Sequence, residues 1–511
     1  MVYNNVACSV IPTRAGIGAM VFTACLFSYM LRVNMSINLI AMVQPRQDSA
    51  NGSVSVPECL IVNNVTIDHS KNIIPDYGVR YNWDQQTQGL ILGAYFWGYI
   101  LTSIPGGLLA ERWGPRMVVG IASFLSGVLT IITPVAATVH YDLVITIRFL
   151  TGFLGGVLYP ALHCLISRWA PPTEKGKFAG ALMGGTFGTV ITWPILGVVS
   201  EQWGWVWAFY LPGILCISWA VLWFIVVSDS PQEHKRISED EKNYIIKSLG
   251  NYITKTKKIP PYKQIFTSVP FWALIILHYG NLWGLYFLLT AGPKFMSEVL
   301  GFNLAHSGGL ASLPYLARMT FGFIFGSIGD TIRRKEWLTV TGIRKWFVVC
   351  SNFIPGLFLL GQILAGCNVV AAVVIITLSL GFNGASTITN IQNSQDLAPN
   401  YAGTLYGIVN CIGGTTGFIT PILTGYITRD HNGMAEWRII FTIGASVYIL
   451  SGIVFCIFGT GEMQPWNNIT EDEVKKEGKG HENHAFEQSE TTHVKKADNG
   501  IQPDVTEITK V

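Results

Sequence analysis

The chain has 511 residues, of which 50% are hydrophobic and only 13% are charged. A soluble chain of this length would carry roughly 25% charged residues and divide into several domains, so the composition excludes an ordinary soluble protein. The formal net charge of +3 is nearly balanced, and no basic tract with interleaved aromatic residues indicates nucleic-acid binding. The chain is therefore expected to lie in a lipid bilayer.

Apolar segments long enough to cross a membrane follow one another along the chain. A helix needs about 20 residues to cross the bilayer core. The sequence therefore predicts an all-α membrane protein with twelve transmembrane helices, two of them within residues 346–395 and the others at 15–43, 85–110, 117–139, 143–167, 178–200, 202–228, 264–293, 303–329, 397–428 and 439–461.

Lysine and arginine residues are concentrated in the predicted loops on the side of the membrane that holds both chain ends. By the positive-inside rule this side is the cytoplasm. The predicted organisation is a cytoplasmic N-terminus (1–14), a six-helix half (15–228) with a large exoplasmic loop (44–86), a cytoplasmic linker (229–268), a second six-helix half (269–460) and a disordered cytoplasmic tail (461–511).

The exoplasmic loop carries two N-glycosylation sequons, at Asn51 and Asn64. Of the nine cysteines, only Cys59 is clearly exoplasmic, and Cys367 is predicted near the same surface. The sequence thus implies no disulfide framework. A bridge between these two cysteines is allowed but not expected.

An internal repeat relates the two halves. An acidic residue followed by basic residues ends the second span and again the eighth, and two proline motifs recur at matching places. The corresponding positions are Glu111 and Asp330, Ala170 and Ala398, and Pro194 and Pro421, which are 219, 228 and 227 residues apart. Such a repeat is typical of transporters whose halves are related by an axis along the membrane normal.

Arg32 and Arg148 lie inside predicted spans, and no acidic residue lies deep in any span to neutralise them. A charge at the bilayer centre costs at least ~2.5–3.5 kcal/mol on insertion scales, so such residues usually mark a substrate or ion path. The missing partner is interpreted as an anionic substrate. The alternatives are that Arg32 binds backbone carbonyls and that Arg148 extends towards the exoplasmic surface.

For each of the other polar groups within the spans, two interpretations are open. Arg318 either faces the central cavity or pairs with carbonyls near the cytoplasmic end. His163 and His278 either titrate near neutral pH or are packed. The tenth span carries a polar stripe that either joins helices or, as we favour, lines the cavity: Asn383, Ser386, Thr387, Thr389, Asn390 and Asn393.

Several segments together resemble the anion:cation symporter family of the major facilitator superfamily, which contains sialin, the vesicular glutamate transporters and the type I sodium-dependent phosphate transporters. They are 29–36 (YMLRVNMS), 96–99 (FWGY), 104–107 (IPGG), 159–163 (YPALH), 169–172 (WAPP), 396–403 (DLAPNYAG) and 461–466 (GEMQPW). The segment 278–283 (HYGNLW) is more similar to sialin than to the glutamate carriers.

The resemblance implies roles for individual residues, because Arg32 and Arg148 fall on the family's two substrate-linked arginines. With the charge argument it gives an expected substrate-binding set of Arg32, Arg148, Tyr29, Asn34, Asn281, Asn393 and Arg318. The repeated loops resemble the superfamily's loop signature and give an expected gating set of Glu111, Arg112, Arg116, Asp330, Arg333 and Arg334.

Gly155 departs from the family pattern. The resemblance places a proton-coupling glutamate seven residues after the arginine of the fourth span, and this chain has glycine there. Type I phosphate transporters also lack that glutamate. The departure weakens the expectation of proton coupling and leaves the expectation of anion transport unchanged.

The expected function is secondary transport of an organic anion or inorganic phosphate by alternating access, with sodium, proton or potential coupling left open. The alternatives are a channel-like anion conductance and a non-transporting receptor of the same fold. We expect no enzymatic activity, metal or cofactor, because no matching motif is visible. A monomer is expected, in the plasma membrane by preference and otherwise in a lysosomal or vesicular membrane.

Overall fold

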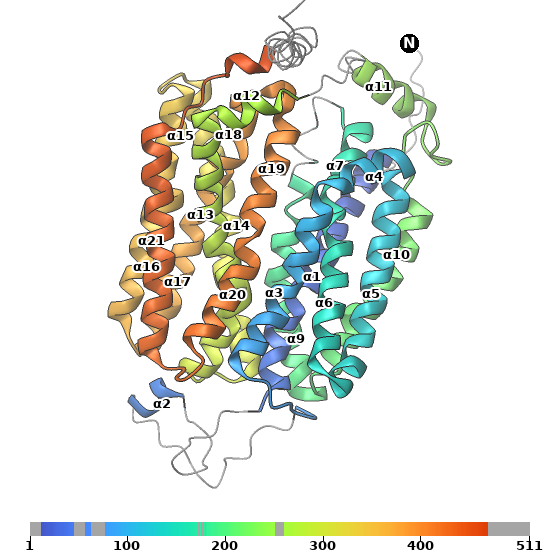
Figure 1. Ribbon diagram of the computed structural model, residues 1–511. Coiled ribbons are helices and arrows are strands. Elements are labelled where there is room, and N and C mark those ends of the chain that lie inside the picture. Colours follow the sequence, from blue (N-terminus) through green and yellow to red (C-terminus); the bar gives the residue numbers. More distant parts are fainter. Residues whose placement is uncertain are drawn as a thin grey trace, which may run out of the picture.

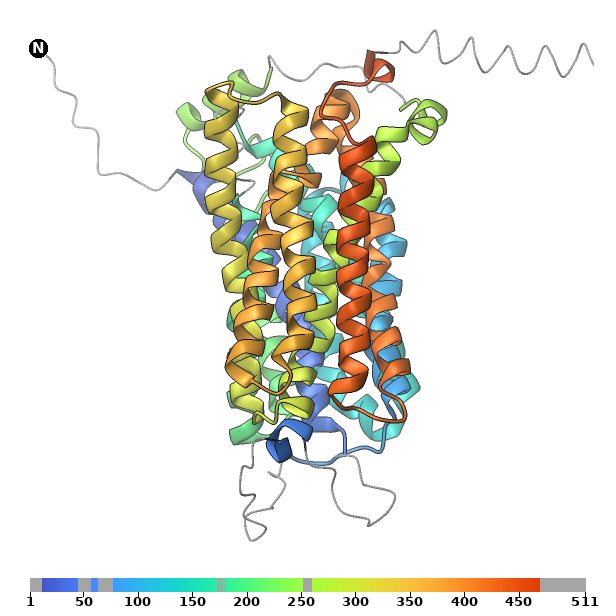
Figure 2. The ribbon, with the colours of Figure 1, turned by 90° about the vertical axis from the view of Figure 1, so that its left-hand side faces the viewer.

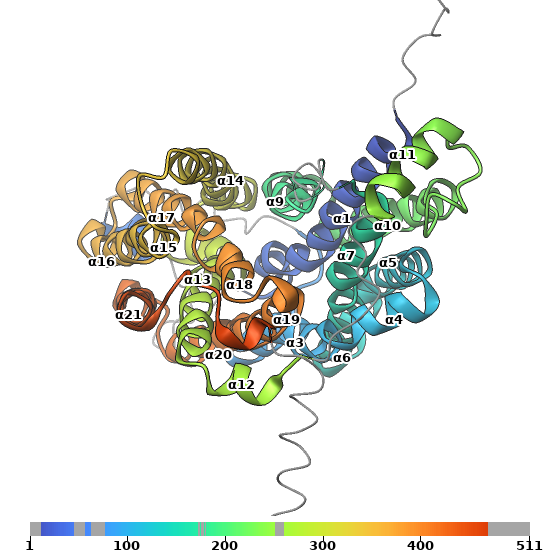
Figure 3. The ribbon, with the colours of Figure 1, turned by 90° about the horizontal axis from the view of Figure 1, so that it is seen from above.

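The computed structural model describes residues 12–44, 57–62, 77–171, 174, 178, 180–250 and 260–468. Within these residues the chain is helical, apart from turns and one isolated bridge between Val43 and Tyr81. The helices form two bundles that stand side by side, one from each half of the sequence (Figures 1 and 3). The predicted all-α fold in two halves is confirmed.

The first bundle is built from long apolar helices, two of which are interrupted. One interruption lies at Pro105, because proline has no N–H to continue the hydrogen-bond ladder of the preceding helix. The other lies at Val157, a turn residue that follows Gly155 and Gly156. The helices are α1 (Thr13–Met42), α3 (Gln85–Ser103), α4 (Pro105–Trp113), α5 (Pro115–Val139), α6 (Tyr141–Gly156), α7 (Leu158–Trp169), α9 (Gly184–Trp203) and α10 (Trp207–Val226).

The second bundle contains more irregular backbone. A π-helical turn extends one helix, and π or 3-10 turns interrupt two others. The elements are α13 (Val269–Lys294) with η3 (Phe295–Val299), α14 (Leu304–Arg334), α15 (Val340–Val348) with η4 (Val349–Phe353) and α16 (Ile354–Ala365), α17 (Val369–Asn383) with η5 (Gly384–Thr387) and α18 (Asn390–Leu397), η6 (Pro399–Tyr401) with α19 (Ala402–Gly414) and α20 (Thr416–Ile427), and α21 (Met434–Phe458).

Short helices lie outside the bundles: α2 (Glu58–Val62) in the loop between the first two spans, and α11 (Glu239–Gly250) and α12 (Tyr262–Thr267) in the linker. The described start of α1 and the end of α21 lie at one end of the molecule, opposite α2, as an even number of crossings requires (Figures 1 and 2). We call the end with α2 the exoplasmic end, following the predicted orientation.

Nine helical segments of the described chain are long and apolar enough to cross a membrane. They correspond to nine of the predicted spans. The other three predicted spans are occupied by α3 with α4, by α9 and by α14. The total of twelve crossings stays a prediction, and the chain is a multi-pass membrane protein.

The two bundles meet along two seams, α3 against α20 and α9 against α14. Small residues permit this close approach: a Cβ on Gly89 would lie 2.6 Å from the carbonyl oxygen of Pro421, and one on Gly197 would lie 2.9 Å from that of Leu304. Small residues at helix contacts are typical of membrane proteins, where backbones pack closely.

A buried lysine joins the bundles at the exoplasmic end. Lys294 of α13 donates hydrogen bonds to the side-chain oxygens of Gln85 and Gln88 on α3, the latter at 2.8 Å. The ammonium also lies 3.9 Å from the carboxylate of Glu298, one helical turn away. Two amide oxygens and a carboxylate thus stabilise a buried charge across the interface. This contact was not predicted from the sequence.

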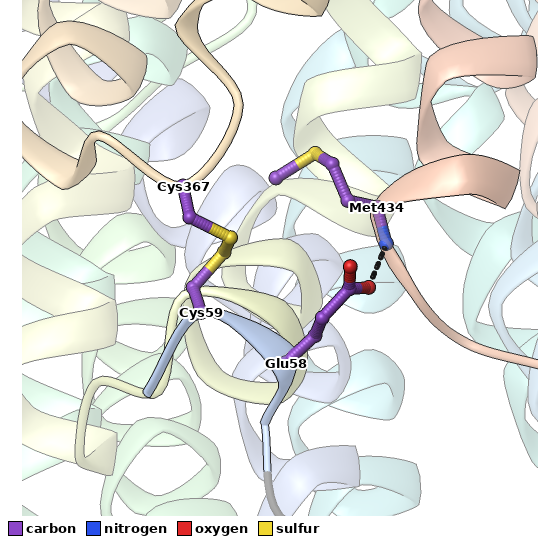
Figure 4. The surroundings of a disulfide bond; sticks show 4 residues. All are labelled: Glu58, Cys59, Cys367 and Met434. Carbon is purple, nitrogen blue, oxygen red and sulfur yellow. Dashed lines mark hydrogen bonds between the residues drawn. A yellow bond between two sulfur atoms is a disulfide. The ribbon is translucent and has the colours of Figure 1, made fainter. Parts of the chain in front are cut away.

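The structure contains a disulfide bond that the sequence did not lead us to expect. Cys59 of α2 is bonded to Cys367, in the turn between α16 and α17 (Figure 4). Beside it, the Glu58 carboxylate accepts a 2.6 Å hydrogen bond from the backbone N–H of Met434. Cys59 and Cys367 lie 308 positions apart in the sequence, so only the fold brings them together. The bond ties the loop of the first half covalently to the second half.

The tail is packed further than expected. We predicted disorder from residue 461, but Trp466 is buried and Gln464 donates its backbone N–H to the carbonyl of Leu397 at 2.8 Å. Asn467 accepts a 3.0 Å hydrogen bond from the backbone N–H of Asn400. The large apolar surface of Trp466 explains this packing. Residues 469–511 lie outside the described chain.

We predict that Cys59→Ser and Cys367→Ser destabilise the protein equally, because either change opens the same bond. The expected loss is about 2–4 kcal/mol in the free energy of unfolding. It should appear as a lower thermal midpoint of the purified full chain, and the double variant should be no worse than either single one. Cys456→Ser, at a half-buried free cysteine, is the control. Additive losses in the double variant, or a thermal midpoint of the wild type that does not change with reductant, would contradict the disulfide bond between Cys59 and Cys367.

Candidate functional site

The guanidinium of Arg32, in the middle of α1, lies inside a ring of aromatic side chains. Its central carbon is 4.6–5.2 Å from the ring centroids of Tyr29, Tyr95, Phe96, Tyr99 and Tyr286. The last of these rings belongs to α13, so Arg32 lies at the interface between the bundles. We call this set of rings the aromatic cage.

The aromatic cage stabilises the positive charge of Arg32 but leaves N–H donors unpaired. Arg32 is only 4% exposed, and its Nε and Nη2 have no hydrogen-bond partner among the described residues. Cation–π contacts contribute about 2 kcal/mol or more when desolvated. A buried donor without an acceptor costs about 1–3 kcal/mol. The arrangement therefore suits a ligand that brings oxygen acceptors, and the planar fork of arginine matches carboxylate or phosphate.

Arg148 of α6 holds α1 in place. Its Nη1 and Nη2 donate to the carbonyl oxygens of Leu31 and Arg32 at 3.2 and 3.0 Å, and its guanidinium lies 5.0 Å from the Tyr95 ring. Arg148 is 5% exposed, so the alternative in which it extends to the surface is wrong. The carbonyl bonding that we had considered for Arg32 is made instead by Arg148.

Two other predicted residues of α1 lie close to Arg32. Tyr29 is part of the aromatic cage and packs edge-on against Tyr159 at 6.4 Å between centroids. Asn34 is 1% exposed, and neither of its side-chain amide atoms has a partner in the described chain. α1 thus carries buried polar groups that its described neighbours do not satisfy.

Arg318 lies on α14, the helix of the second bundle that packs against α9 of the first. Its Nε donates to the side-chain oxygen of Asn383 at 3.0 Å, and its Nη2 donates to the Ser386 hydroxyl at 3.4 Å. The described hydrogen bonds of Arg318 are to side chains and not to carbonyls, and its place in the cavity stays a prediction.

A chain of buried amides supports Arg318. Asn383 donates to the side-chain oxygen of Asn281 at 2.8 Å, Asn281 donates to that of Asn352 at 2.8 Å, and Asn352 donates to the Ser451 hydroxyl at 2.9 Å. Asn352 lies in the π-helical turn η4, a kind of irregularity frequent at functional sites. Asn352 was not among the residues predicted from the sequence, although an asparagine inside a long apolar run is a usable signal.

The polar stripe of the tenth span joins helices, whereas its role in lining a cavity stays a prediction. Asn383 and Ser386 bind Arg318, whereas Asn390 contacts the Nδ1 of His278 at 2.5 Å and joins two helices. His278 is buried and packed. His163 of α7 is exposed.

Asn393 does not join the site. Its side-chain nitrogen donates to the carbonyl oxygen of Thr460 at 2.8 Å, after the end of α21. We had expected Asn393 to contact substrate because it continues the polar stripe of the tenth span. The stripe leads away from the arginines because the backbone changes from α17 through η5 to α18 before this residue.

The predicted gating residues lie at the cytoplasmic end, where two acids outside the predicted set, Asp229 and Asp396, also bind arginine residues. Arg112, Asp330, Arg333 and Arg334 are exposed, as is Glu111. Arg116 donates its backbone N–H to Asp229 at 2.7 Å. In the second bundle the buried Arg344 binds both carboxylate oxygens of Asp396, at 2.6 and 3.1 Å. The sequence analysis gave neither acid a role.

Tyr95 occupies the space beside Gly155. A Cβ built on Gly155 would overlap the Tyr95 hydroxyl. A small cavity lies against both residues and is also lined by the polar side chains of Ser28, Ser126 and Thr151. The Tyr95 hydroxyl thus fills the place where relatives are expected to carry a glutamate. The Tyr95 ring also contacts the guanidinium groups of Arg32 and Arg148.

Two other expectations concern N-glycosylation and metal binding. The sequons at Asn51 and Asn64 lie outside the described residues, so their glycosylation stays a prediction. Among the described residues, no group of three or more histidine, cysteine, aspartate or glutamate side chains could hold a metal ion.

Comparison with known proteins identifies the class of protein. The family model of the Major Facilitator Superfamily matches residues 17–421. The chain belongs to this superfamily and is a secondary transporter. The structure of a bacterial homologue of the human lysosomal transporter Spinster, inward-facing and unoccupied, shares the fold, with a TM-score of 0.61 at 13% identity over 89% of this chain and 100% of that one.

Two relatives place the chain within the superfamily. It is 36% identical to sialin of Homo sapiens, over 90% of this chain and 91% of that protein. It is 34% identical to vesicular glutamate transporter 2 of Homo sapiens, over 94% of this chain and 80% of that protein. The resemblance to the anion:cation symporter family is confirmed.

We predict that Gly155→Ala lowers the free energy of unfolding by about 1–3 kcal/mol, because the new methyl group displaces the Tyr95 hydroxyl. Tyr95→Phe removes that hydroxyl, so the double variant should recover part of the loss in thermal midpoint. Gly292→Ala is a matched control, since no atom lies within 4 Å of a Cβ there. The interpretation fails if Gly155→Ala is as harmless as this control.

Proposed function

We propose that this protein transports an organic anion or inorganic phosphate across the membrane by alternating access, and that Arg32 binds the anion. The observation that carries the proposal is a buried guanidinium at the interface of the two bundles with two N–H donors lacking partners. Substrate sites of such transporters lie at the midplane, between the repeats. The anion would supply the missing acceptors and offset the cost of the buried charge.

In this proposal Arg148 acts mainly by holding α1. Its bonds to the carbonyls of Leu31 and Arg32 fix the backbone that carries the binding side chain. It also adds a second positive charge beside Tyr95. Substrate thus meets a preorganised cationic surface, which lowers the entropic cost of binding.

Alternating access requires the seams to open in turn. At the exoplasmic end, the bonds from Lys294 to Gln85 and Gln88 join the bundles and would have to break before that end could open. Rigid-body rocking of the halves about the bound anion would exchange this contact for others at the cytoplasmic end. We propose that second role for two exposed groups, Glu111 and Arg112 of α4 and Asp330, Arg333 and Arg334 of α14, together with Arg116.

Transport is proposed to be coupled to an ion or to the membrane potential. With Tyr95 beside Gly155, the expected glutamate position offers no carboxylate to carry a proton. Sodium, proton and voltage gradients can be imposed separately on proteoliposomes. We further propose a monomer without cofactor or enzymatic activity, in the plasma membrane or a lysosomal or vesicular membrane.

The test is uptake of labelled phosphate, sialate, glutamate and urate into proteoliposomes that contain the full chain. We expect saturable uptake with counterflow of at least one anion, which separates a transporter from a channel. Arg32→Gln should lower kcat/KM for that anion at least about 100-fold, because it removes a charge-assisted contact of roughly 3 kcal/mol. Arg148→Ala should abolish uptake, because the backbone that carries Arg32 is then no longer held by the bonds from Arg148.

Arg438→Gln is the control, because Arg438 is exposed at the exoplasmic end of α21. All variants are compared at equal amounts of reconstituted protein. Uptake that survives in Arg32→Gln would overturn the assignment of Arg32. Binding without flux in the wild type would instead favour a receptor.

A further inference from the structure

The short helix α2 belongs to the loop between the first two spans, yet the bonds described for it are to the second bundle. Cys59 is bonded to Cys367 in the turn between α16 and α17, and the Glu58 carboxylate accepts the backbone N–H of Met434 at 2.6 Å (Figure 4). Met434 is the first residue of α21, so the acid lies where the helix dipole favours negative charge. A segment of the first half is thus fastened to two turns of the second bundle.

A third contact of α2 reaches one of the seams between the bundles. Leu60 packs against the turn before α14, where a Cβ on Gly301 would lie 2.5 Å from the Leu60 side chain. Two residues further along this turn, Asn303 donates its side-chain N–H to the carboxylate of Glu201 on α9, at 3.4 Å. The turn beside Leu60 therefore carries a hydrogen bond that crosses the seam between α9 and α14.

The turn before α21 leads to the other seam. Asn432, in this turn, donates its side-chain N–H to the carboxylate of Glu298. Glu298 lies 3.9 Å from the ammonium of Lys294, which donates hydrogen bonds to Gln85 and Gln88 of α3 in the first bundle. From the turn that α2 contacts, polar contacts therefore continue to the buried lysine that joins the bundles.

Opening the exoplasmic end requires both of these seams to separate. The side chains that the second bundle contributes to them, Lys294 and Asn303, are each connected to a turn that α2 contacts. A helix as short as α2, with 5 residues, is not stable in water by itself. The disulfide bond therefore keeps Glu58 and Leu60 at their contacts, at a high effective concentration.

We propose that α2 is a brace that keeps the exoplasmic end of the transporter closed, and that reduction of the bond between Cys59 and Cys367 releases it. Release lowers the free energy of the state that is open to the exoplasmic side relative to the closed state, and so raises its population. The inference rests on the proposed alternating access and adds a control of it from the exoplasmic side.

The disulfide bond can be reached from that side. Cys367 is half-buried, and a surface hollow lined in part by Val62, Cys367 and Asn368 adjoins it. The reductant is a dithiol, whose thiolate attacks one sulfur atom and forms a mixed disulfide. Its second thiol then displaces that sulfur atom. The S–S bond of the protein breaks, the two cysteines gain two electrons and two protons and become thiols, and the dithiol becomes a disulfide.

The test measures how readily Lys294 is modified from the exoplasmic side. The full chain in proteoliposomes is treated with or without dithiothreitol, alkylated with iodoacetamide and exposed to a membrane-impermeant N-hydroxysuccinimide ester. Modified Lys294 is quantified by mass spectrometry. The Lys294 side chain is only 8% exposed while the bundles are joined. We expect reduction to raise its rate of modification at least about fivefold, because the open state becomes more populated.

An internal control and three variants accompany this measurement. Lys335, exposed at the cytoplasmic end of α14, is modified in copies of the opposite orientation and should not respond to dithiothreitol. Cys367→Ser should show the raised modification of Lys294 without dithiothreitol, which should add nothing further. Leu60→Ala, with the disulfide intact, should raise it about twofold, because one contact is lost. Cys456→Ser, which removes a free cysteine, should keep the wild-type response.

Unchanged modification of Lys294 after full reduction would overturn the inference. So would a rise accompanied by alkylation of Cys25 and Cys216, because these thiols are buried in the first bundle and report unfolding. The readout needs no substrate. Saturable anion uptake with an unresponsive Lys294 would therefore contradict the brace and leave the proposed transport intact. A responsive Lys294 without uptake of any anion would support the brace and contradict the proposed transport.

Discussion

A guanidinium buried in a membrane without an acidic partner is the constraint on which the rest of this structure depends. The charge of Arg32 is kept in place by the aromatic cage, and α1 is kept in place by the bonds from Arg148 to its carbonyls. One ring of the cage, Tyr286, belongs to the other bundle, so opening the interface would change the surroundings of Arg32. In the proposed mechanism, anion binding and rocking of the bundles are therefore linked through the side chain of Arg32.

The two bundles use different means to present polar groups inside a membrane. In the first, Arg148 donates two hydrogen bonds to backbone carbonyls of a neighbouring helix. In the second, irregular turns at η4 and η5 place Asn352 and Ser386 in a buried network that holds Arg318. Non-helical backbone at membrane depth is tolerated where protein surrounds it, and it is here that a site of mixed polarity can form.

Local signals in the sequence predicted much of this architecture. Apolar runs gave the helices, the repeated motifs gave the two halves, and lone arginines in apolar runs pointed to Arg32 and Arg148. Pairings between distant segments were not predictable, because neither partner is unusual alone: Cys59 with Cys367, Arg344 with Asp396, and Lys294 with Gln85 are known only once the helices are packed. Asn393 was misplaced for a related reason, since its helix turns away after η5.

The most direct measurement is an electron cryomicroscopy structure of the full chain with a transported anion bound. The account predicts anion oxygens within hydrogen-bond distance of Nε and Nη2 of Arg32, with the bonds from Arg148 to Leu31 and Arg32 retained. An anion bound elsewhere, with the Arg32 guanidinium still enclosed by its rings and its donors still unpaired, would contradict it.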